Sequence, residues 1–189
     1  MDDSSAFENE KNLPVARQRS ADPYVMLARQ SVEAFVRTGH PLKTPENLPG
    51  DLLTGKAGVF VSLHEADALR GCIGTIDPVC DCLADEIIRN GVYACSEDPR
   101  FPPVQENELE KLVYGVDVLF EPEPIDSSAG LDPLRYGVIV SKGCRRGLLL
   151  PNLEGIDTVE MQIRIAKQKA GIEPEEICRL ERFEVIRHE

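Results

Sequence analysis

One stretch of the chain, LRGCIGT at residues 69–75, holds a cation, a thiol, a hydroxyl and two glycines within seven positions. Its side chains alternate in character, which predicts a strand over residues 69–76 with one face on the hydrophobic core. Arg70 and Cys72 share the opposite face of this strand. We therefore expect the functional surface of the molecule to lie on that face.

The thiol of Cys72 is the candidate reactive group. Arg70 is expected roughly 7 Å away along the strand, and a guanidinium at that range favours the nucleophilic thiolate form. Gly71 and Gly74 flank the thiol, and glycine inside a strand often marks the close approach of a ligand or another backbone. These residues indicate an open floor for a small ligand. The alternative is that the glycines relieve crowding at a bulge and that Cys72 is an inert core residue.

A second strand is predicted directly before this one, at residues 58–64, from alternating β-forming side chains. The short turn between the two strands predicts an antiparallel hairpin. This hairpin would bring His64 near one face of the LRGCIGT strand, where it would act as a base for Cys72. The alternative is a solvated histidine at a strand end.

The remaining elements define the fold class. Helices are predicted from caps and apolar periodicity at residues 23–38, about 80–96 and about 158–170. Further strands are predicted at residues 112–120, 136–141, 147–150 and 180–187, with one loop at 40–56 and another marked by Gly130 and Pro133. The strands occur in hairpins and do not alternate regularly with helices. This pattern favours an α+β fold with a mostly antiparallel sheet flanked by helices.

The chain of 189 residues suits one domain, or one domain with a smaller lobe. Residues 1–20 are polar and lack periodicity, which predicts a mobile N-terminal tail before a single domain at residues 21–189. No apolar run approaches the roughly 18 residues of a membrane span, and no basic region precedes an apolar stretch. We therefore expect a cytoplasmic protein with no membrane partner.

Acidic residues outnumber basic ones by 33 to 21, which gives a net charge of −12. Sequence-independent binding of nucleic acid requires clustered lysines and arginines. One basic cluster is present at Lys142, Arg145 and Arg146, and we interpret it as a solvated hairpin tip. The composition therefore predicts that nucleic acid is not a partner.

The cysteines do not follow a known metal or disulfide pattern. An even number of cysteines suits small secreted domains, but a chain without an export signal is expected to keep its thiols reduced. Cys80 and Cys82 are one residue apart, whereas common zinc and redox motifs separate two cysteines by two residues. A zinc site of Cys72, Cys80 and Cys82 is an alternative that this spacing disfavours. We predict no metal site, and no cofactor follows from the sequence.

A proline-rich segment, DPRFPPV at residues 98–104, is the second candidate element of the site. Its three prolines predict a stiff, extended connection. Asp98 and Arg100 are then held on a rigid backbone, which suits the edge of a binding site. The alternative is a local ion pair that braces the loop, which contributes about 0 to 1 kcal/mol when exposed.

Three segments together resemble one family. They are GVFV followed by LRGCIGT, then DPRF, then GLLLP at residues 147–151. The chain is similar to the AMMECR-one family over roughly residues 20–189; its bacterial and archaeal members are called AmmeMemoRadiSam system protein A. KQKAG at residues 167–171 also resembles the Lys-Ala-Gly that follows the family's last long helix. Residues 152–157 form a shorter segment than the family usually has before that helix.

The resemblance implies an α+β fold with a main sheet and a smaller lobe, and it places LRGCIGT in a cleft between them. The resemblance does not imply a particular reaction, because the family has no established activity. The family name links its members with a Memo-like protein, similar to metal-dependent dioxygenases, and with a radical-SAM protein. That association implies a shared pathway or complex.

Two functions of different classes follow. In an enzyme on a small molecule, Cys72 would be the nucleophile or redox thiol, Arg70 would hold the thiolate or an anionic substrate, and Thr75 would donate a hydrogen bond. Asp98 and Arg100 would shape the rim. No histidine is securely placed as a base, which argues against this function. The alternative is a non-catalytic adaptor or ligand-binding module that uses the same glycines and arginine without a reactive thiol.

Overall fold

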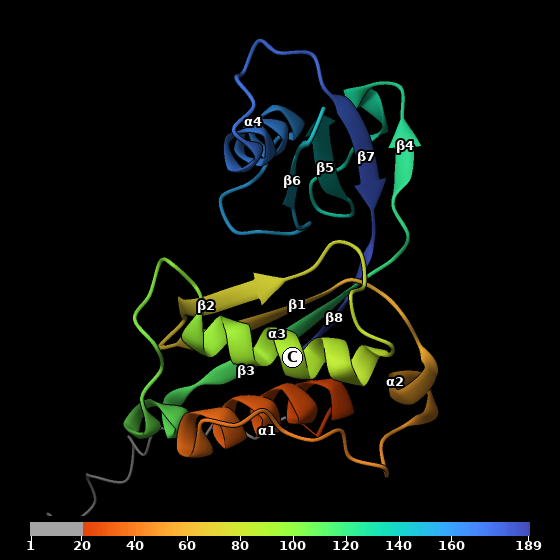
Figure 1. Cartoon of the computed structure of the whole chain (residues 1–189). Helices are drawn as coiled ribbons and strands as arrows, with labels where there is room; N and C mark the ends of the chain where they lie inside the picture. The colour runs from red at the N-terminus through yellow and green to blue at the C-terminus, as the bar shows by residue number, and fades with distance from the viewer. Residues whose placement is uncertain (1–20) are drawn as a thin grey trace, which may run out of the picture.

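A computed structural model describes residues 21–189, and the predicted tail at residues 1–20 lies outside the described residues. The chain forms two lobes stacked one above the other (Figure 1). The lower lobe in this view contains one sheet and the first three helices, and the upper lobe contains a second sheet and the last helix. Both sheets are antiparallel throughout, so the predicted α+β class is confirmed.

The first sheet has the strand order β2-β1-β3-β8. Its strands are β1 (Val59–Glu65), β2 (Ala68–Gly74), β3 (Val113–Leu119) and β8 (Val185–His188). The predicted hairpin of β1 and β2 is confirmed, and its register sets Cys72 opposite Ser62. The apolar side chains of β1 are buried on the face that is covered by helices; they are Val59, Val61 and Leu63.

The helices of this lobe are α1 (Pro23–Thr38), α2 (Gly50–Thr54) and α3 (Leu83–Ser96). Helix α1 begins where the Asp22 carboxylate accepts the amide hydrogen bond of Tyr24 at 2.8 Å, as the Asp-Pro signal predicts. Helix α3 begins later than the predicted start near residue 80. Helix α2 lies in a segment that was predicted to be a loop. In Figure 1, α1 lies under α3, and α3 packs against the sheet.

The second sheet has the strand order β4-β7-β5-β6. Its strands are β4 (Glu123–Ile125), β5 (Gly137–Lys142), β6 (Arg145–Leu149) and β7 (Arg179–Phe183). Helix α4 (Val159–Ala170) packs on β5 and β6, and its start at a Thr158 cap and its end at Gly171 follow the prediction. Short 3-10 helices η1 (Glu106–Lys111) and η2 (Ser128–Gly130) complete the described elements.

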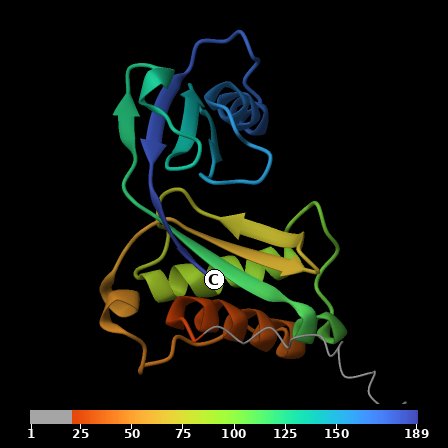
Figure 2. The ribbon, with the colours of Figure 1, turned by 180° about the vertical axis from the view of Figure 1, so that it is seen from behind.

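The prediction of one closing strand at residues 180–187 is wrong. The segment is divided into β7 in the second sheet and β8 in the first, with Glu184 between them. The carbonyl of Glu184 accepts the amide hydrogen bond of Phe120 at 2.9 Å, where the outgoing chain leaves the first lobe. Both segments are extended, so alternation alone does not show that they belong to different sheets. Figure 2 shows the two crossings between the lobes, from β3 to β4 and from β7 to β8.

A third apolar cluster joins the two lobes. Its buried members come from β3, β5, β6 and β7, and they are Leu119, Ile139, Leu148 and Phe183. Phe60 of β1 packs against them from the open face of the first sheet. An ion pair also crosses the junction, because Arg146 lies 2.6 Å from Asp77 in the loop after β2. The face of the first sheet that carries Cys72 therefore lies toward the second lobe.

Candidate functional site

The backbone of Cys72 is held by the DPRF segment. Strand β2 is at the edge of its sheet, and its outer N–H and C=O groups face away from β1. The amide of Cys72 donates to Asp98 Oδ2 at 2.9 Å, and Arg100 Nη2 donates to the carbonyl of Cys72 at 3.1 Å. These two side chains satisfy the edge in place of a neighbouring strand. DPRF therefore fixes the position of Cys72.

Asp98 and Arg100 also form an ion pair with each other. Arg100 Nε donates to Asp98 Oδ1 at 2.9 Å and Arg100 Nη2 donates to Oδ2 at 2.6 Å, a two-point contact. Asp98 is only 4% exposed. The hydrogen bonds from Arg100, and then that from the Cys72 amide, outweigh burial and lower the pKa of Asp98 to about 2. The ion pair is present as one alternative predicted, and it braces a strand edge as well as the loop.

Arg70 points away from the thiol. The register of β1 and β2 shifts between Leu63 and His64, which leaves Arg70 as the extra residue of a bulge. Its Nε and Nη2 donate to the two carboxylate oxygens of Glu108 in η1 at 2.7 and 3.1 Å, and its Nη1 donates to the carbonyl of Pro102 at 3.0 Å. Arg70 therefore anchors η1 and the proline segment. The bulge and this carboxylate, which strand alternation does not reveal, explain the difference from the predicted partner of Cys72.

The Cys72 thiol is half-buried, and its pKa lies above its ordinary value. Burial raises the pKa most, and the carboxylates of Asp117 and Asp98 add to this effect, whereas Arg100 and Lys169 lower it. The expectation of a depressed pKa set by Arg70 is therefore wrong. The cations that favour the thiolate are Arg100 and Lys169, and burial outweighs them.

The two glycines are not an open floor. A Cβ atom on Gly71 would lie 2.3 Å from the carbonyl oxygen of Ala94 in α3. A Cβ atom on Gly74 would lie 2.3 Å from the ring of Phe60. Both positions are filled by the protein itself, so these glycines allow close packing of the strand on its neighbours. The prediction of close approach is confirmed, but the approaching groups are a helix backbone and an aromatic ring.

Thr75 belongs to a structural network at the end of β2. Its hydroxyl donates to the carboxylate of Glu86 in α3, which is 1% exposed. The amides of Val79 and Cys80 donate to the other carboxylate oxygen at 2.9 and 2.8 Å. Burial acts to raise the pKa of Glu86, but the hydrogen bonds, led by that from Thr75, lower it overall. Thr75 thus ties the turn after β2 to α3 and does not point its donor at Cys72.

His64 is not opposite the thiol. It pairs with Leu69 on β2 and with Val113 on β3, whereas Ser62 is the residue of β1 opposite Cys72. His64 shares the open face of the sheet with Ser62 but lies two positions further along the strand. The hydroxyl of Ser62 is therefore the β1 side-chain polar group opposite the thiol.

Lys169 is the residue that sequence reasoning missed. It lies in the last turn of α4, and its ammonium interacts electrostatically with the Cys72 thiol and the Arg100 guanidinium. Although the residue is exposed, protein atoms near the ammonium reduce its hydration and lower its pKa; the thiol acts to raise the pKa and Arg100 acts to lower it. Within residues 21–189 it forms no ion pair with a carboxylate. The sequence signal that points to Lys169 is the family resemblance of KQKAG at residues 167–171.

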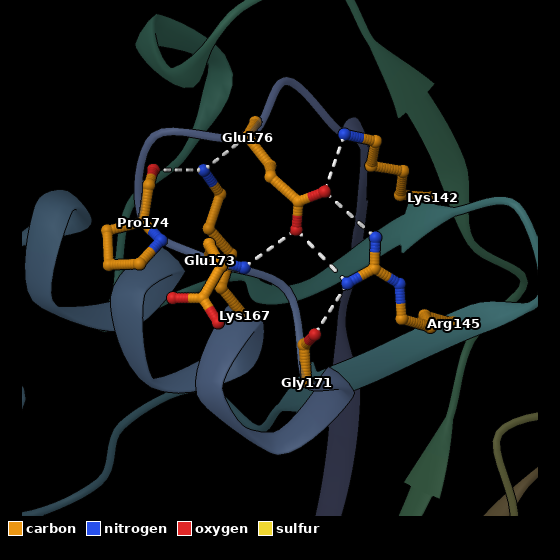
Figure 3. Close-up of polar contacts among 7 residues, drawn as sticks. All are labelled: Lys142, Arg145, Lys167, Gly171, Glu173, Pro174 and Glu176. Atoms are coloured by element: carbon orange, nitrogen blue, oxygen red, sulfur yellow. Dashed lines mark hydrogen bonds and ion pairs between the residues drawn. The ribbon is translucent and has the colours of Figure 1, made fainter.

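The end of α4 is fixed by a cluster around Glu176 (Figure 3). The Glu176 carboxylate accepts hydrogen bonds from Lys142 at 2.7 Å and from Arg145 at 2.9 Å. Arg145 also donates to the carbonyl of Gly171, the residue that ends α4, at 2.6 Å. Lys167 donates to the carbonyl of Glu176 at 2.7 Å from the last turn of α4. Two cations of the predicted basic hairpin tip are therefore paired with a carboxylate, and they hold the turn that carries Lys169.

Among the residues that the structure describes, no cluster of three or more histidine, cysteine, aspartate or glutamate side chains is arranged to hold a metal ion. Between residues 21 and 189, no helix combines the length and the apolar character needed to cross a bilayer.

These features define a two-lobed α+β protein with a cysteine on a braced edge strand, where cations of both lobes act electrostatically on its thiol. The sequence profile of the AMMECR1 family matches residues 25–188, and the chain belongs to this family. A Thermotoga maritima protein is 51% identical over 168 residues, which are 88% of this chain and 97% of that protein. A crystal structure of an uncharacterized Pyrococcus horikoshii protein superposes with a TM-score of 0.81 at 34% identity, covering 87% of this chain and 88% of the other.

One relative is much longer. A Clostridium acetobutylicum protein is 48% identical over 174 residues, which are 92% of this chain but 37% of that protein. This chain therefore spans little more than a third of that relative.

Proposed function

We propose that this protein is an enzyme acting on a small molecule at the junction of its two lobes, with Cys72 as the reacting thiol. We call Cys72, Arg100 and Lys169 the thiol site. The observation that carries the proposal is that Lys169, from the second lobe, interacts with the thiol of the first lobe and has no carboxylate partner within residues 21–189. A purely structural cysteine does not require such a partner.

The electrostatics of the thiol site suit a thiol that is protonated at rest. As the thiol loses its proton to solvent, the sulfur gains a negative charge and can donate an electron pair to an electrophilic carbon of a substrate. The sulfur–carbon bond then forms while the electron pair of one existing bond of that carbon moves to the atom or leaving group that held the bond. Arg100 and Lys169 stabilise that charge as it forms. Arg70, Thr75 and the two glycines contribute indirectly, since they hold β2 in place. They are positioning residues in this proposal.

Alkylation of the native protein with iodoacetamide tests the proposal, with each cysteine read by peptide mass between pH 7 and 9.5. Cys144 is exposed and serves as the fast reference. Cys95 is 3% exposed and burial raises its pKa to about 12, so it is the slow reference. We expect Cys72 to react more slowly than Cys144 but at least about tenfold faster than Cys95. A Cys72 that stays as unreactive as Cys95 until the protein unfolds would rule out the thiol enzyme.

An adaptor role is the second candidate. It is favoured by the Clostridium acetobutylicum relative, in which a region similar to this chain is part of a longer polypeptide. Regions that share one polypeptide often act together. Memo-like and radical-SAM proteins are the proposed partners, on the family's name alone.

Sedimentation of this protein mixed with each purified candidate partner tests that role. Complex formation at micromolar concentration is expected of an adaptor, since interfaces of ordinary size reach that affinity. Unchanged sedimentation of both proteins at about 50 μM would reject it.

A further inference from the structure

We propose that the thiol site binds an anionic group, a carboxylate or phosphate of the ligand, between Arg100 of the first lobe and Lys169 of the second. This inference rests on the proposed function and names the chemical class of its substrate. The proposal concerns the group beside the thiol and leaves the rest of the ligand open.

The first observation is the balance of charge around the thiol. Two carboxylates, Asp98 and Asp117, and two cations, Arg100 and Lys169, act electrostatically on it. Asp98 pairs with Arg100 at 2.6 Å and Asp117 pairs with Arg187 at 2.8 Å. Lys169 forms no ion pair among residues 21–189. One positive charge is therefore uncompensated while Cys72 is protonated, in a chain whose net charge is −12.

The second observation is that two like charges are held near each other by separate supports. Arg100 and Lys169 repel, and this repulsion acts to lower the pKa of Lys169. Arg100 is fixed by its ion pair with Asp98, and the turn that carries Lys169 is fixed by the contact of Arg145 with Gly171. These contacts fix the backbone positions from which the two cationic side chains extend. An anion between them would replace the repulsion with two attractive interactions.

The third observation is that Arg100 and Lys169 have hydrogen-bond donors without an acceptor among residues 21–189. Arg100 uses Nε and Nη2 for Asp98 and the Cys72 carbonyl, while Nη1 makes no hydrogen bond to a described residue. The Arg100 side chain is 51% exposed. Lys169 is also exposed and has three ammonium hydrogens to donate. A guanidinium and an ammonium together are the usual recognition groups for phosphate and carboxylate.

The thiolate of Cys72 is the competing anion, because it too would balance Lys169. Two alkylating reagents separate these possibilities. Iodoacetate carries a carboxylate and iodoacetamide does not, while both transfer a carbon to sulfur with loss of iodide. A site that binds anions accelerates iodoacetate selectively, whereas a site that only stabilises the thiolate accelerates both reagents alike.

The experiment measures the ratio of the iodoacetate rate to the iodoacetamide rate at Cys72, at pH 8 and constant ionic strength. The reference is the same ratio at Cys72 in the urea-unfolded protein. We expect the ratio in the native protein to be about fivefold higher or more, and inorganic phosphate to reduce it. Lys169→Met should return the ratio close to the reference and Lys169→Arg should preserve it. Arg164→Met is the matched control, because Arg164 is an exposed cation of α4 without a partner among residues 21–189, and it should change nothing.

Thermal unfolding in phosphate gives a readout that does not need the thiol. Phosphate should raise the melting temperature of the wild type and of Arg164→Met at constant ionic strength, but not that of Lys169→Met. If Cys72 reacts with both reagents at reference ratio and phosphate has no effect, the anion site is wrong and the thiol proposal stands. If Cys72 is inert but phosphate stabilises through Lys169, the anion site stands and the thiol enzyme fails.

Discussion

The amide of Cys72 donates a hydrogen bond to Asp98 Oδ2 at 2.9 Å, across 26 residues of chain. This contact joins the two segments that the sequence singled out, LRGCIGT and DPRF. It also explains why the acidic residue must be charged and buried: it accepts from the strand edge on one side and from Arg100 on the other. An unpaired edge strand would otherwise be open to another chain.

Asp98→Asn is expected to remove the part of the pH dependence of the unfolding free energy that comes from this contact. The folded pKa of Asp98 is about 2, below its ordinary 3.8, so folding favours the charged form. Its contribution is present above the unfolded value and is lost as the pH falls from about 4 to about 2. The difference corresponds to about 2 kcal/mol of unfolding free energy at pH 7. Urea unfolding of both proteins between pH 7 and 2 should show a gap that narrows over that window.

The control for that experiment is Asp126→Asn, which removes an exposed carboxylate that forms no ion pair within residues 21–189. Its unfolding free energy should follow the wild type throughout. A gap between Asp98→Asn and the wild type that stays constant down to pH 2 would contradict the prediction.

Arg70→Met and Arg100→Met should differ in their effect on the reactivity of the Cys72 thiol. Arg70 pairs with Glu108 and is not among the charged groups that chiefly shift the pKa of the Cys72 thiol. We expect Arg70→Met to leave the iodoacetamide rate at Cys72 within about twofold, since the dominant cation is unchanged. Arg100→Met should slow that rate severalfold at pH 8, because the cation that lowers the pKa of the thiol most is lost. Equal effects of the two changes would show that the assignment of the cation is mistaken.

Gly74→Ala and Gly71→Ala should both destabilise the fold, by about 1 to 3 kcal/mol as overpacking does. The neighbour at Gly74 is the Phe60 ring, and the neighbour at Gly71 is the backbone of Ala94. Phe60→Leu should therefore partly rescue Gly74→Ala, with a coupling of about 1 kcal/mol in a double-mutant cycle. The same change should not rescue Gly71→Ala. Additive energies at both positions would be evidence against the described packing.

Glu176→Ala should loosen the turn that carries Lys169. The Glu176 carboxylate accepts hydrogen bonds from Lys142 and Arg145. The hydrogen bonds from Arg145 hold the pKa of Glu176 well below the usual range. We expect amide hydrogen exchange over residues 171–178 to accelerate about tenfold, while exchange in β1 stays unchanged. Glu175→Ala, an exposed neighbour, is the matched control and should leave both regions as they are. A uniform acceleration across the chain would indicate global destabilisation.

Local signals in the sequence predicted much of the fold. Caps at Asp22 and Thr158 and glycines at the helix ends set the bounds of α1 and α4, because those interactions lie within a few residues of each other. The β1–β2 hairpin followed from alternation and a short turn. The division of residues 180–187 between two sheets did not, because extended chain looks the same in either sheet.

At the candidate site, the sequence by itself singled out two segments that the fold brings together, LRGCIGT with Cys72 and its glycines, and DPRF, which holds the strand edge. Only the tertiary structure decided the charges around that thiol. A single-residue bulge turns Arg70 toward Glu108, and the packing of the two lobes places Lys169 of the last helix where its charge acts on Cys72. Neither relationship can be derived from spacing along the chain, since one depends on the register of a strand pair and the other on how two sheets pack.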